Sequence, residues 1–147
     1  MKLKMTNELA WLIGFWKMRR TRIGIGVIGN PEIQQKFVKK VIELKLTPPE
    51  KIRVEKRMVV FRHIKLENFF RKVVENQNEI FNRPNKLTIS YLKGMCESAL
   101  KDNILKNATF QDAMLIERLG FYTTREGRSI KIIKINEFLS FLKRFDN

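Results

Sequence analysis

Two long apolar segments with helical character constrain the fold of this chain more than any other feature. The first extends from Glu8 to Met18 and can be capped by Thr6 or Asn7, whose side chains accept hydrogen bonds from a first helical turn. The second extends from Thr88 to Leu100. Because few polar residues interrupt either segment, both are expected to be buried helices.

The segments that follow the first helix alternate between strand and helix patterns. Branched residues alternate with small or polar ones over 22–28 and predict a strand. Pro31 then opens a helix that continues to about Leu46. A second strand pattern over 51–63 fits either a tight hairpin or one long bent strand, and the pattern over 66–74 predicts a helix.

The same order begins again in the second part of the chain. A polar, turn-rich stretch over 76–85 shows no periodicity and is interpreted as a linker. After it come the second apolar helix, a poorer segment, and a helix over 109–119. Two strand patterns then flank the turn residues 126–127, and Asn136 is expected to cap a last helix that ends near Arg144.

This repetition divides the chain into two subdomains, 1–85 and 86–147. A doubled unit usually packs about a pseudo-twofold axis and presents one continuous surface. The sequence therefore predicts an α+β fold of two similar subdomains, with internal pseudo-twofold symmetry in a monomer.

Charge indicates the class of partner. The 147 residues include 30 Lys and Arg against 15 Asp and Glu, which gives a net charge of +15. Residues 1–85 carry a net +11 and residues 86–147 a net +4, so the first half should dominate an electrostatic contact. Such a field favours nucleic acid, because each phosphate that a cation neutralises releases condensed counterions. A ribosome-associated surface or a generally basic proteome would give the same composition.

Metal, disulfide and membrane classes are not favoured. Cys96 is the single cysteine, which excludes an internal disulfide, and His63 is the single histidine, so the usual Cys and His zinc constellations cannot form. No uninterrupted apolar stretch reaches the roughly 18 residues that a membrane span needs. We expect no cofactor, no metal, no membrane contact and a cytoplasmic location.

The two apolar helices carry a resemblance to a known family. Residues 12–20, which read Leu-Ile-Gly-Phe-Trp-Lys-Met-Arg-Arg, resemble the first motif helix of the LAGLIDADG homing endonucleases and their inteins. Residues 91–100 look like a second copy, and the motif glycine falls at the expected place in each, at Gly14 and Gly94. Residues 116–122 are similar to the family's run from a helix into a terminal hairpin. The resemblance covers nearly the whole chain, and two copies with matching flanks are more specific than one.

The resemblance implies a doubled αββαββα unit. In this family the motif helices pack together at their glycines, and curved antiparallel sheets lie over the DNA groove. An Asp or Glu normally occupies the eighth motif position and binds Mg²⁺, but Arg19 and Ala99 stand at these positions here. A guanidinium repels a cation and alanine offers no ligand, so we expect no cleavage by the family mechanism and no enzyme activity.

Two carboxylates are candidates to replace the missing acids. Glu97 precedes the vacant position of its helix by two residues, about 200° round it, so it cannot substitute without a shift in register. Asp102 is the nearest candidate in the second half. An endonuclease with displaced metal-binding acids is therefore one alternative.

The candidate binding residues are basic. Arg19, Arg20 and Arg22 form a basic cluster at the end of the first helix, which either clamps phosphates or is a solvated helix end whose cations complement the helix dipole. Other basic residues sit on the strand patterns, at or beside positions that can face away from the core, as expected for a ribbon in a major groove. The full predicted nucleic-acid-binding set is Arg19, Arg20, Arg22, Arg53, Arg57, Arg62, Arg125, Arg128 and Lys131.

These observations favour a protein that binds double-stranded DNA, specifically or with tolerance of sequence, and does not cut it. A regulatory or architectural role fits such a protein. The alternative from a different class is binding to structured RNA or a ribosomal site, where recognition would depend on phosphates, minor-groove edges and 2′-hydroxyls.

Overall fold

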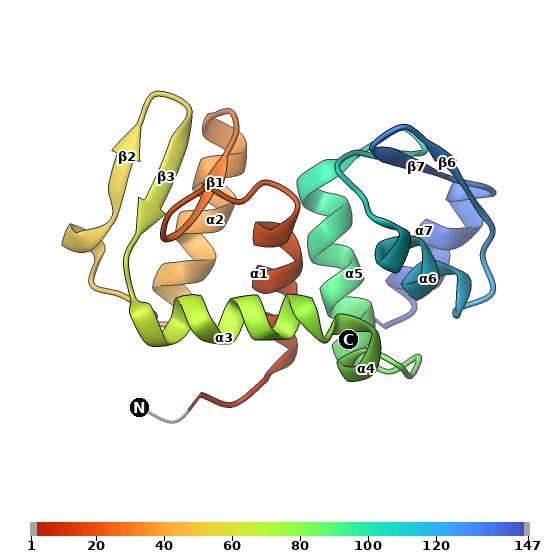
Figure 1. The fold of residues 1–147 in the computed structure, drawn as a ribbon, viewed down its shortest axis with the longest axis horizontal. Coiled ribbons are helices and arrows are strands. Elements are labelled where there is room, and N and C mark those ends of the chain that lie inside the picture. Colours follow the sequence, from red (N-terminus) through yellow and green to blue (C-terminus); the bar gives the residue numbers. More distant parts are fainter. Residues whose placement is uncertain (1–2, 146–147) are drawn as a thin grey trace.

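Two helices that lie side by side form the centre of the molecule. In the computed structural model, which describes residues 3–145, these are α1 (Asn7–Lys17) and α5 (Lys86–Ala99) (Figure 1). Thr6 caps the first helix by accepting from the backbone N–H of Leu9 at 3.1 Å. Asn85 caps the second in the same way. The prediction of two buried apolar helices is confirmed.

The two central helices approach each other closely at their glycines. A Cβ atom added to Gly14 would collide with the backbone carbonyl group of Tyr91, and one added to Gly94 would lie 2.8 Å from the backbone nitrogen of Phe15. Any side chain larger than hydrogen would therefore push the helices apart. The close contact that the resemblance implies at these glycines is confirmed.

The first half of the chain builds a three-stranded antiparallel sheet against α1. Its further elements are β1 (Ile25–Ile28), α2 (Pro31–Glu43), the short 3₁₀ helix η1 (Pro49–Lys51), β2 (Arg53–Glu55), β3 (Met58–Phe61) and α3 (Ile64–Glu75), with strand order β1-β3-β2. An isolated bridge between Arg20 and Val27 adds one more antiparallel pairing beside β1. The tight hairpin between β2 and β3 is one of the two geometries that the sequence left open.

The second half builds a four-stranded antiparallel sheet against α5. Its elements are β4 (Leu100–Lys101), β5 (Ile104–Leu105), α6 (Phe110–Glu117), β6 (Thr123–Glu126), β7 (Ser129–Ile132) and α7 (Ile135–Lys143), with strand order β4-β5-β7-β6. If the Arg20 bridge is taken as a first strand, both halves follow the same order of helix, two strands, helix, two strands, helix. An α+β fold with antiparallel sheets is thus present.

The stretch over 76–85 is not only a linker. It contains the short helix α4 (Gln77–Ile80), and the Gln77 side chain is buried. Gln77 accepts from the Tyr91 hydroxyl at 2.5 Å and donates to Asp112 at 2.8 Å. A polar composition suggested exposure here, but the interior supplies partners for the amide, so its burial carries little penalty.

Other boundaries also differ from the sequence-based prediction. The first strand begins at Ile25 and not at 22, because Gly24 turns the chain with a φ of +76°. The strands β4 and β5 were not predicted, since two residues each are too few to show alternation. The last helix begins at Ile135 after Lys134 in the left-handed region, so Asn136 lies inside it and does not cap it.

Helices cover the inner face of each sheet and close the core. Ile33, Phe37 and Val41 of α2 are buried, and the Phe37 ring lies 6.4 Å from that of Phe61 on β3. In the second half, Phe138 of α7 is buried and its ring lies 5.2 Å from that of Phe121. Among residues 3–145 there is no helix whose length and apolar character would suffice to cross a membrane.

The glycine contacts predict that exchange of glycine for alanine destabilises these helices, which is the opposite of its usual effect. Exchange of glycine for alanine within an ordinary exposed helix stabilises it by about 1 kcal/mol. At Gly14 and Gly94 we expect the opposite, a loss of about 1–3 kcal/mol in the free energy of unfolding, because the new methyl group overpacks the helix contact. Chemical denaturation of Gly14→Ala and Gly94→Ala measures this. Unchanged or increased stability in both variants would contradict the close packing of α1 and α5.

Candidate nucleic-acid interface

The register of the first sheet determines which side chains face away from the core. Val27 pairs with Val59, and both are fully buried, so this pair defines the inner face. The next pair along, Gly26 with Val60, therefore lies on the outer face, and Arg53 pairs with Val60 from the other side. The outward position predicted for Arg53 agrees with this register.

A groove of about 790 Å³ lies along this outer face. Its apolar lining includes Ile23 and Ile28, which are 64% and 48% exposed, together with Met58 and Val60. Exposed branched side chains cost free energy in water, so they mark a surface that a partner could cover. Basic side chains also line the groove, namely Arg22, Lys51, Arg53 and Arg62.

The ion pairs of the groove's arginines are weak and exposed. Arg53 lies 2.6 Å from Glu55 and Arg62 lies 3.3 Å from Glu67, and both arginine side chains are more than half exposed. Exposed pairs of this kind contribute about 0–1 kcal/mol, so they can be exchanged for phosphate oxygens at little cost. The groove therefore combines an apolar floor with cations that are available to an anionic partner.

The second sheet also carries basic residues on its outer face. Lys131 pairs with Ile104 and Thr124 on that face, whereas Arg125 pairs with the buried Ile130. Arg125 therefore lies on the core side of the sheet at its edge, although it is exposed. We expected Arg125 on the outer face. The register of the hairpin determines which face a strand residue occupies, and this register cannot be read from the sequence.

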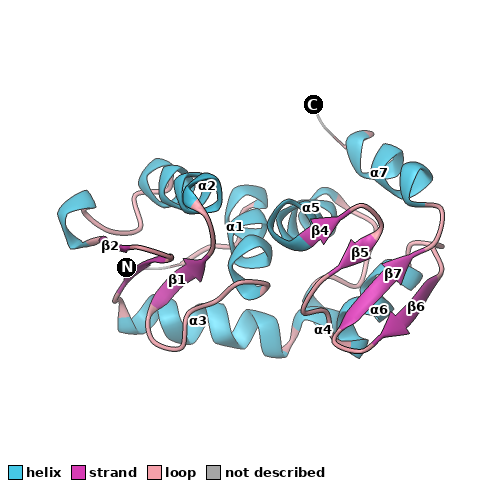
Figure 2. Cartoon of the chain, turned by 90° about the horizontal axis from the view of Figure 1, so that it is seen from above, coloured by secondary structure: helices cyan, strands magenta, loops and turns pink. Residues whose placement is uncertain are grey.

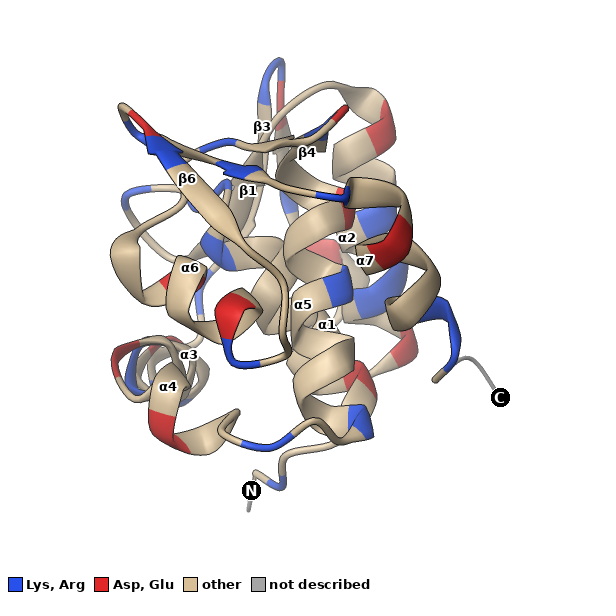
Figure 3. Cartoon of the chain, turned by 90° about the vertical axis from the view of Figure 1, so that its right-hand side faces the viewer, with Lys and Arg blue, Asp and Glu red and all other residues tan. Residues whose placement is uncertain are grey.

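Two predicted residues occupy turns. Arg57 lies in the turn between β2 and β3, and Arg128 lies in the turn between β6 and β7. Both are exposed, so the tips of both hairpins are basic. Seen from above in Figure 2, the two sheets lie on the same side of the molecule, one beside α1 and one beside α5. In Figure 3, Lys and Arg (blue) lie along the strands in the upper part of the picture.

Arg19 is bound within the molecule. Its Nε donates to the carbonyl of Ser98 near the end of α5, and a terminal nitrogen donates to the carbonyl of Ile28 at 3.1 Å. It therefore links the end of α1 to the end of the other central helix, where a cation also complements the helix dipole. Arg20 lies with its guanidinium 5.4 Å from the centre of the Trp16 ring, in a cation–π contact. Arg19 and Arg20 thus have different partners, although the sequence predicted one basic cluster.

The two carboxylates considered as replacements lie in different surroundings. Glu97 of α5 accepts from the indole nitrogen of Trp11 on α1, so this side chain links the two central helices. Asp102 lies in the turn between β4 and β5 with a φ of +57°. Within residues 3–145, no three His, Cys, Asp or Glu side chains are grouped so that they could hold a metal ion.

Sequence reasoning missed a buried polar cluster between the two halves. Lys17 of α1 forms an ion pair with Asp112 of α6, and the two side chains are 7% and 0% exposed. Gln77 joins them, because its Oε1 accepts from the Lys17 ammonium at 3.0 Å and from the Tyr91 hydroxyl. Thr109 and Asp112 have the spacing of a capping box, and this spacing is the local sequence feature that could have indicated a structural role for Asp112.

Burial shifts the pKa values in this cluster. Desolvation lowers the pKa of Lys17, and the neighbouring charge of Asp112 opposes that shift. Desolvation and the same carboxylate raise the pKa of Tyr91 well above its ordinary value. Perturbed groups often mark catalytic sites, but side chains this deeply buried give a substrate no access. We interpret the cluster as a structural link between the halves.

The single cysteine and the single histidine have structural roles. Burial raises the pKa of the Cys96 thiol to about 12, so it is protonated and unreactive in the native state. The Nδ1 atom of His63 accepts from the backbone N–H of Leu66 at 3.3 Å and caps α3.

Comparison of the chain with protein-family models, with curated proteins and with solved structures found no match. The candidate interface therefore depends on the geometry and charge described above.

The buried ion pair predicts a large effect from a single substitution. Lys17→Met would leave the Asp112 charge buried without its cation, and we expect a loss of about 3–5 kcal/mol in the free energy of unfolding. Lys65→Met, at an exposed position on α3, should change it by less than about 0.5 kcal/mol. Adding Asp112→Asn to Lys17→Met should recover part of the loss in urea denaturation. Equal stability of the Lys17 and Lys65 variants would show that the pair does not hold the halves together.

Proposed function

We propose that this protein binds double-stranded DNA through the outer faces of its two sheets and does not cut it. The observation that carries the proposal is the groove on the first sheet, where Arg22, Lys51, Arg53 and Arg62 surround an exposed apolar floor. Cations would contact phosphates and the acceptor edges of guanine, and apolar side chains would contact thymine methyl groups in the major groove. A regulatory or architectural role fits this activity.

We also propose that the chain derives from the LAGLIDADG homing endonucleases, with a pseudo-twofold axis between α1 and α5. Three observations support this. With the Arg20–Val27 bridge counted as a strand, the element order repeats and the strand order is equivalent in both sheets, and both central helices meet at a glycine. An axis between these helices would bring the two outer sheet faces to the same side, and the arrangement in Figure 2 is compatible with that. A duplex would then span both halves of one monomer.

The absence of cutting follows from the residues at the ends of the central helices. Metal-assisted hydrolysis needs anionic oxygens that hold a cation against the scissile phosphate. Arg19 and Ala99 stand where the family resemblance expects those oxygens, and Arg19 donates to two carbonyl groups there. A positive group so placed can bind phosphate but opposes a metal ion.

The groove predicts a specific effect of charge reversal. We expect Lys51→Glu combined with Arg53→Glu to weaken duplex binding and to flatten its salt dependence, since each lost phosphate contact changes the slope of log K against log salt by about 0.9. Lys39→Glu combined with Lys143→Glu is the control, because it changes the net charge equally at exposed helix positions. Fluorescence anisotropy over a salt series measures both.

Equal losses in the two variants would mean that diffuse charge, and not the groove, produces binding. The same titration with an RNA duplex of matched sequence separates the alternative partner. Tighter binding to RNA would favour a site for structured RNA over the DNA proposal, because an A-form duplex offers a wide minor groove and 2′-hydroxyls in place of a readable major groove.

The second prediction of this proposal is that the protein leaves DNA intact. Excess protein incubated with supercoiled plasmid and Mg²⁺ or Mn²⁺ should give no nicked or linear product above that of the buffer. Nicking that disappears in Glu97→Ala or Asp102→Ala would show instead that displaced acids hold a metal.

A further inference from the structure

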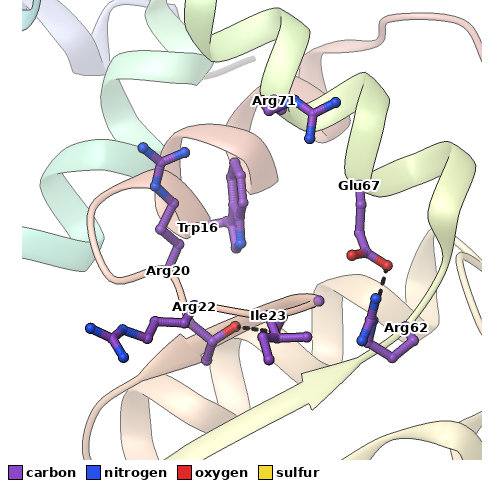
Figure 4. A pocket seen from close by; sticks show the side chains of 9 residues that line it. Trp16, Arg20, Arg22, Ile23, Arg62, Glu67 and Arg71 are labelled. Atoms are coloured by element: carbon purple, nitrogen blue, oxygen red, sulfur yellow. Dashed lines mark hydrogen bonds and ion pairs between the residues drawn. The ribbon is translucent and has the colours of Figure 1, made fainter.

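A second pocket, of about 520 Å³, lies beside the groove on the side of α3. Trp16 at the end of α1, the segment 20–24, Arg62 after β3, and Glu67 and Arg71 of α3 line it (Figure 4). In Figure 4 the side chains of Arg20, Arg62 and Arg71 surround the open space from different elements. The pocket is thus built by two stretches of the first half of the chain, 16–24 and 62–71.

The charge of this pocket is strongly unbalanced. Four arginines, Arg20, Arg22, Arg62 and Arg71, line it together with a single carboxylate, Glu67. That carboxylate already accepts from Arg62 at 3.3 Å and from the backbone N–H of His63 at 2.9 Å. The lining therefore carries three positive charges in excess, and repulsion among them favours a bound anion.

The Trp16 indole gives an independent indication of a ligand. The residue is 5% exposed, and its indole nitrogen is buried without a hydrogen-bond partner. In Figure 4 this nitrogen lies on the edge of the ring that points toward Arg22 and Ile23. A buried N–H donor without an acceptor is costly, and an anionic oxygen would satisfy it.

The same ring is not a platform for a nucleobase. Phe70 contacts it edge to face with a centroid distance of 5.3 Å, and Arg20 stacks against it. What the pocket offers a ligand is therefore guanidinium groups and one N–H donor, the chemistry that recognises phosphate oxygens.

We infer that this pocket is a binding site for an oligophosphate group, adjacent to the sheet groove. Three excess positive charges suit two or more linked phosphates better than a single monoanion, and the volume is that of a small-molecule site. The phosphates belong either to a free phosphorylated small molecule or to nucleic-acid backbone that continues from the groove. The two cavities share Thr21, Arg22, Ile23 and Arg62, so an occupant of one is in reach of the other.

Titration with tripolyphosphate tests the site. We expect saturable binding with a stoichiometry of one by calorimetry, and a shift of the Trp16 indole N–H resonance in ¹⁵N-labelled protein. Trp11 is the internal control, because its indole already donates to Glu97 and should shift little. Trp11→Phe assigns the two resonances, since the chain has two tryptophans.

Arg71→Gln is the decisive variant, because Arg71 lines this pocket and not the groove and lies on the exposed surface of α3. We expect about tenfold or greater loss of tripolyphosphate affinity, the size of effect usual for a hydrogen bond to a charged group. Lys72→Gln, its exposed neighbour on the same helix, should lose less than about threefold. Equal losses in both variants, or binding without a shift of Trp16, would overturn the inference.

A duplex then distinguishes the two sources of phosphate. If backbone occupies the pocket, Arg71→Gln will weaken duplex binding and a duplex will displace tripolyphosphate. If a free small molecule is the occupant, duplex affinity will be unchanged by Arg71→Gln. Failure of the protein to bind any duplex would refute the proposed function but leave the tripolyphosphate result to decide this site.

Discussion

The contact between α1 and α5 is the constraint on which the rest of the structure depends. At Gly14 and Gly94 each helix presents bare backbone to the other, so their separation is set by main-chain atoms and not by side-chain size. Each helix also leads into the strands of its own half, which fixes where the two sheets lie relative to each other. A shift of this contact would therefore move both sheets, and with them the surface that we propose for DNA.

The charged residues of this protein form two groups, a buried ion pair between the halves and exposed cations on the surface. Lys17 is buried and neutralised by Asp112. Gln77 hydrogen-bonds to both of them and to the Tyr91 hydroxyl, and the cluster connects α1, α4, α5 and α6. Such a buried pair adds little net stability, but misalignment of the halves would leave its charges unpaired. In contrast, the arginines of the groove and of the pocket beside it are mostly exposed, in a chain with a net charge of +15. A polyanion bound at the proposed surface would relieve their mutual repulsion.

The sequence predicts local features of the fold better than it predicts the site. The two central helices could be recognised from the sequence for two reasons. Thr6 caps α1 through the backbone of its own first turn, and a similar motif with a glycine recurs at Gly14 and Gly94. The face of Arg125 depends on the register with Ile130, which a hairpin of the same sequence pattern could change by one residue.

The remaining features of the site involve partners far away in the chain. Arg19 bonds to the carbonyl of Ser98, and the pocket beside the groove joins Trp16 to Arg71 across three elements. Contacts of this kind leave no periodic trace in the sequence, because they depend on how α3 and the segment 20–24 pack. Helix patterns therefore predict the scaffold, while the outer surfaces depend on tertiary packing.

Arg19 explains how the proposed loss of cutting can coexist with an intact scaffold. Carboxylates at the ends of two close helices repel each other and need a metal ion to lie together. A guanidinium at the same place supplies its own positive charge, and here it donates to Ser98 of the opposite helix and to Ile28 beside β1. Arginine at this position thus provides a hydrogen-bonded link between the halves at the place where the resemblance expects a metal ion. If the chain derives from that family as we propose, this exchange would remove hydrolysis while keeping a link between the helix ends, and the proposed DNA surface would need no metal.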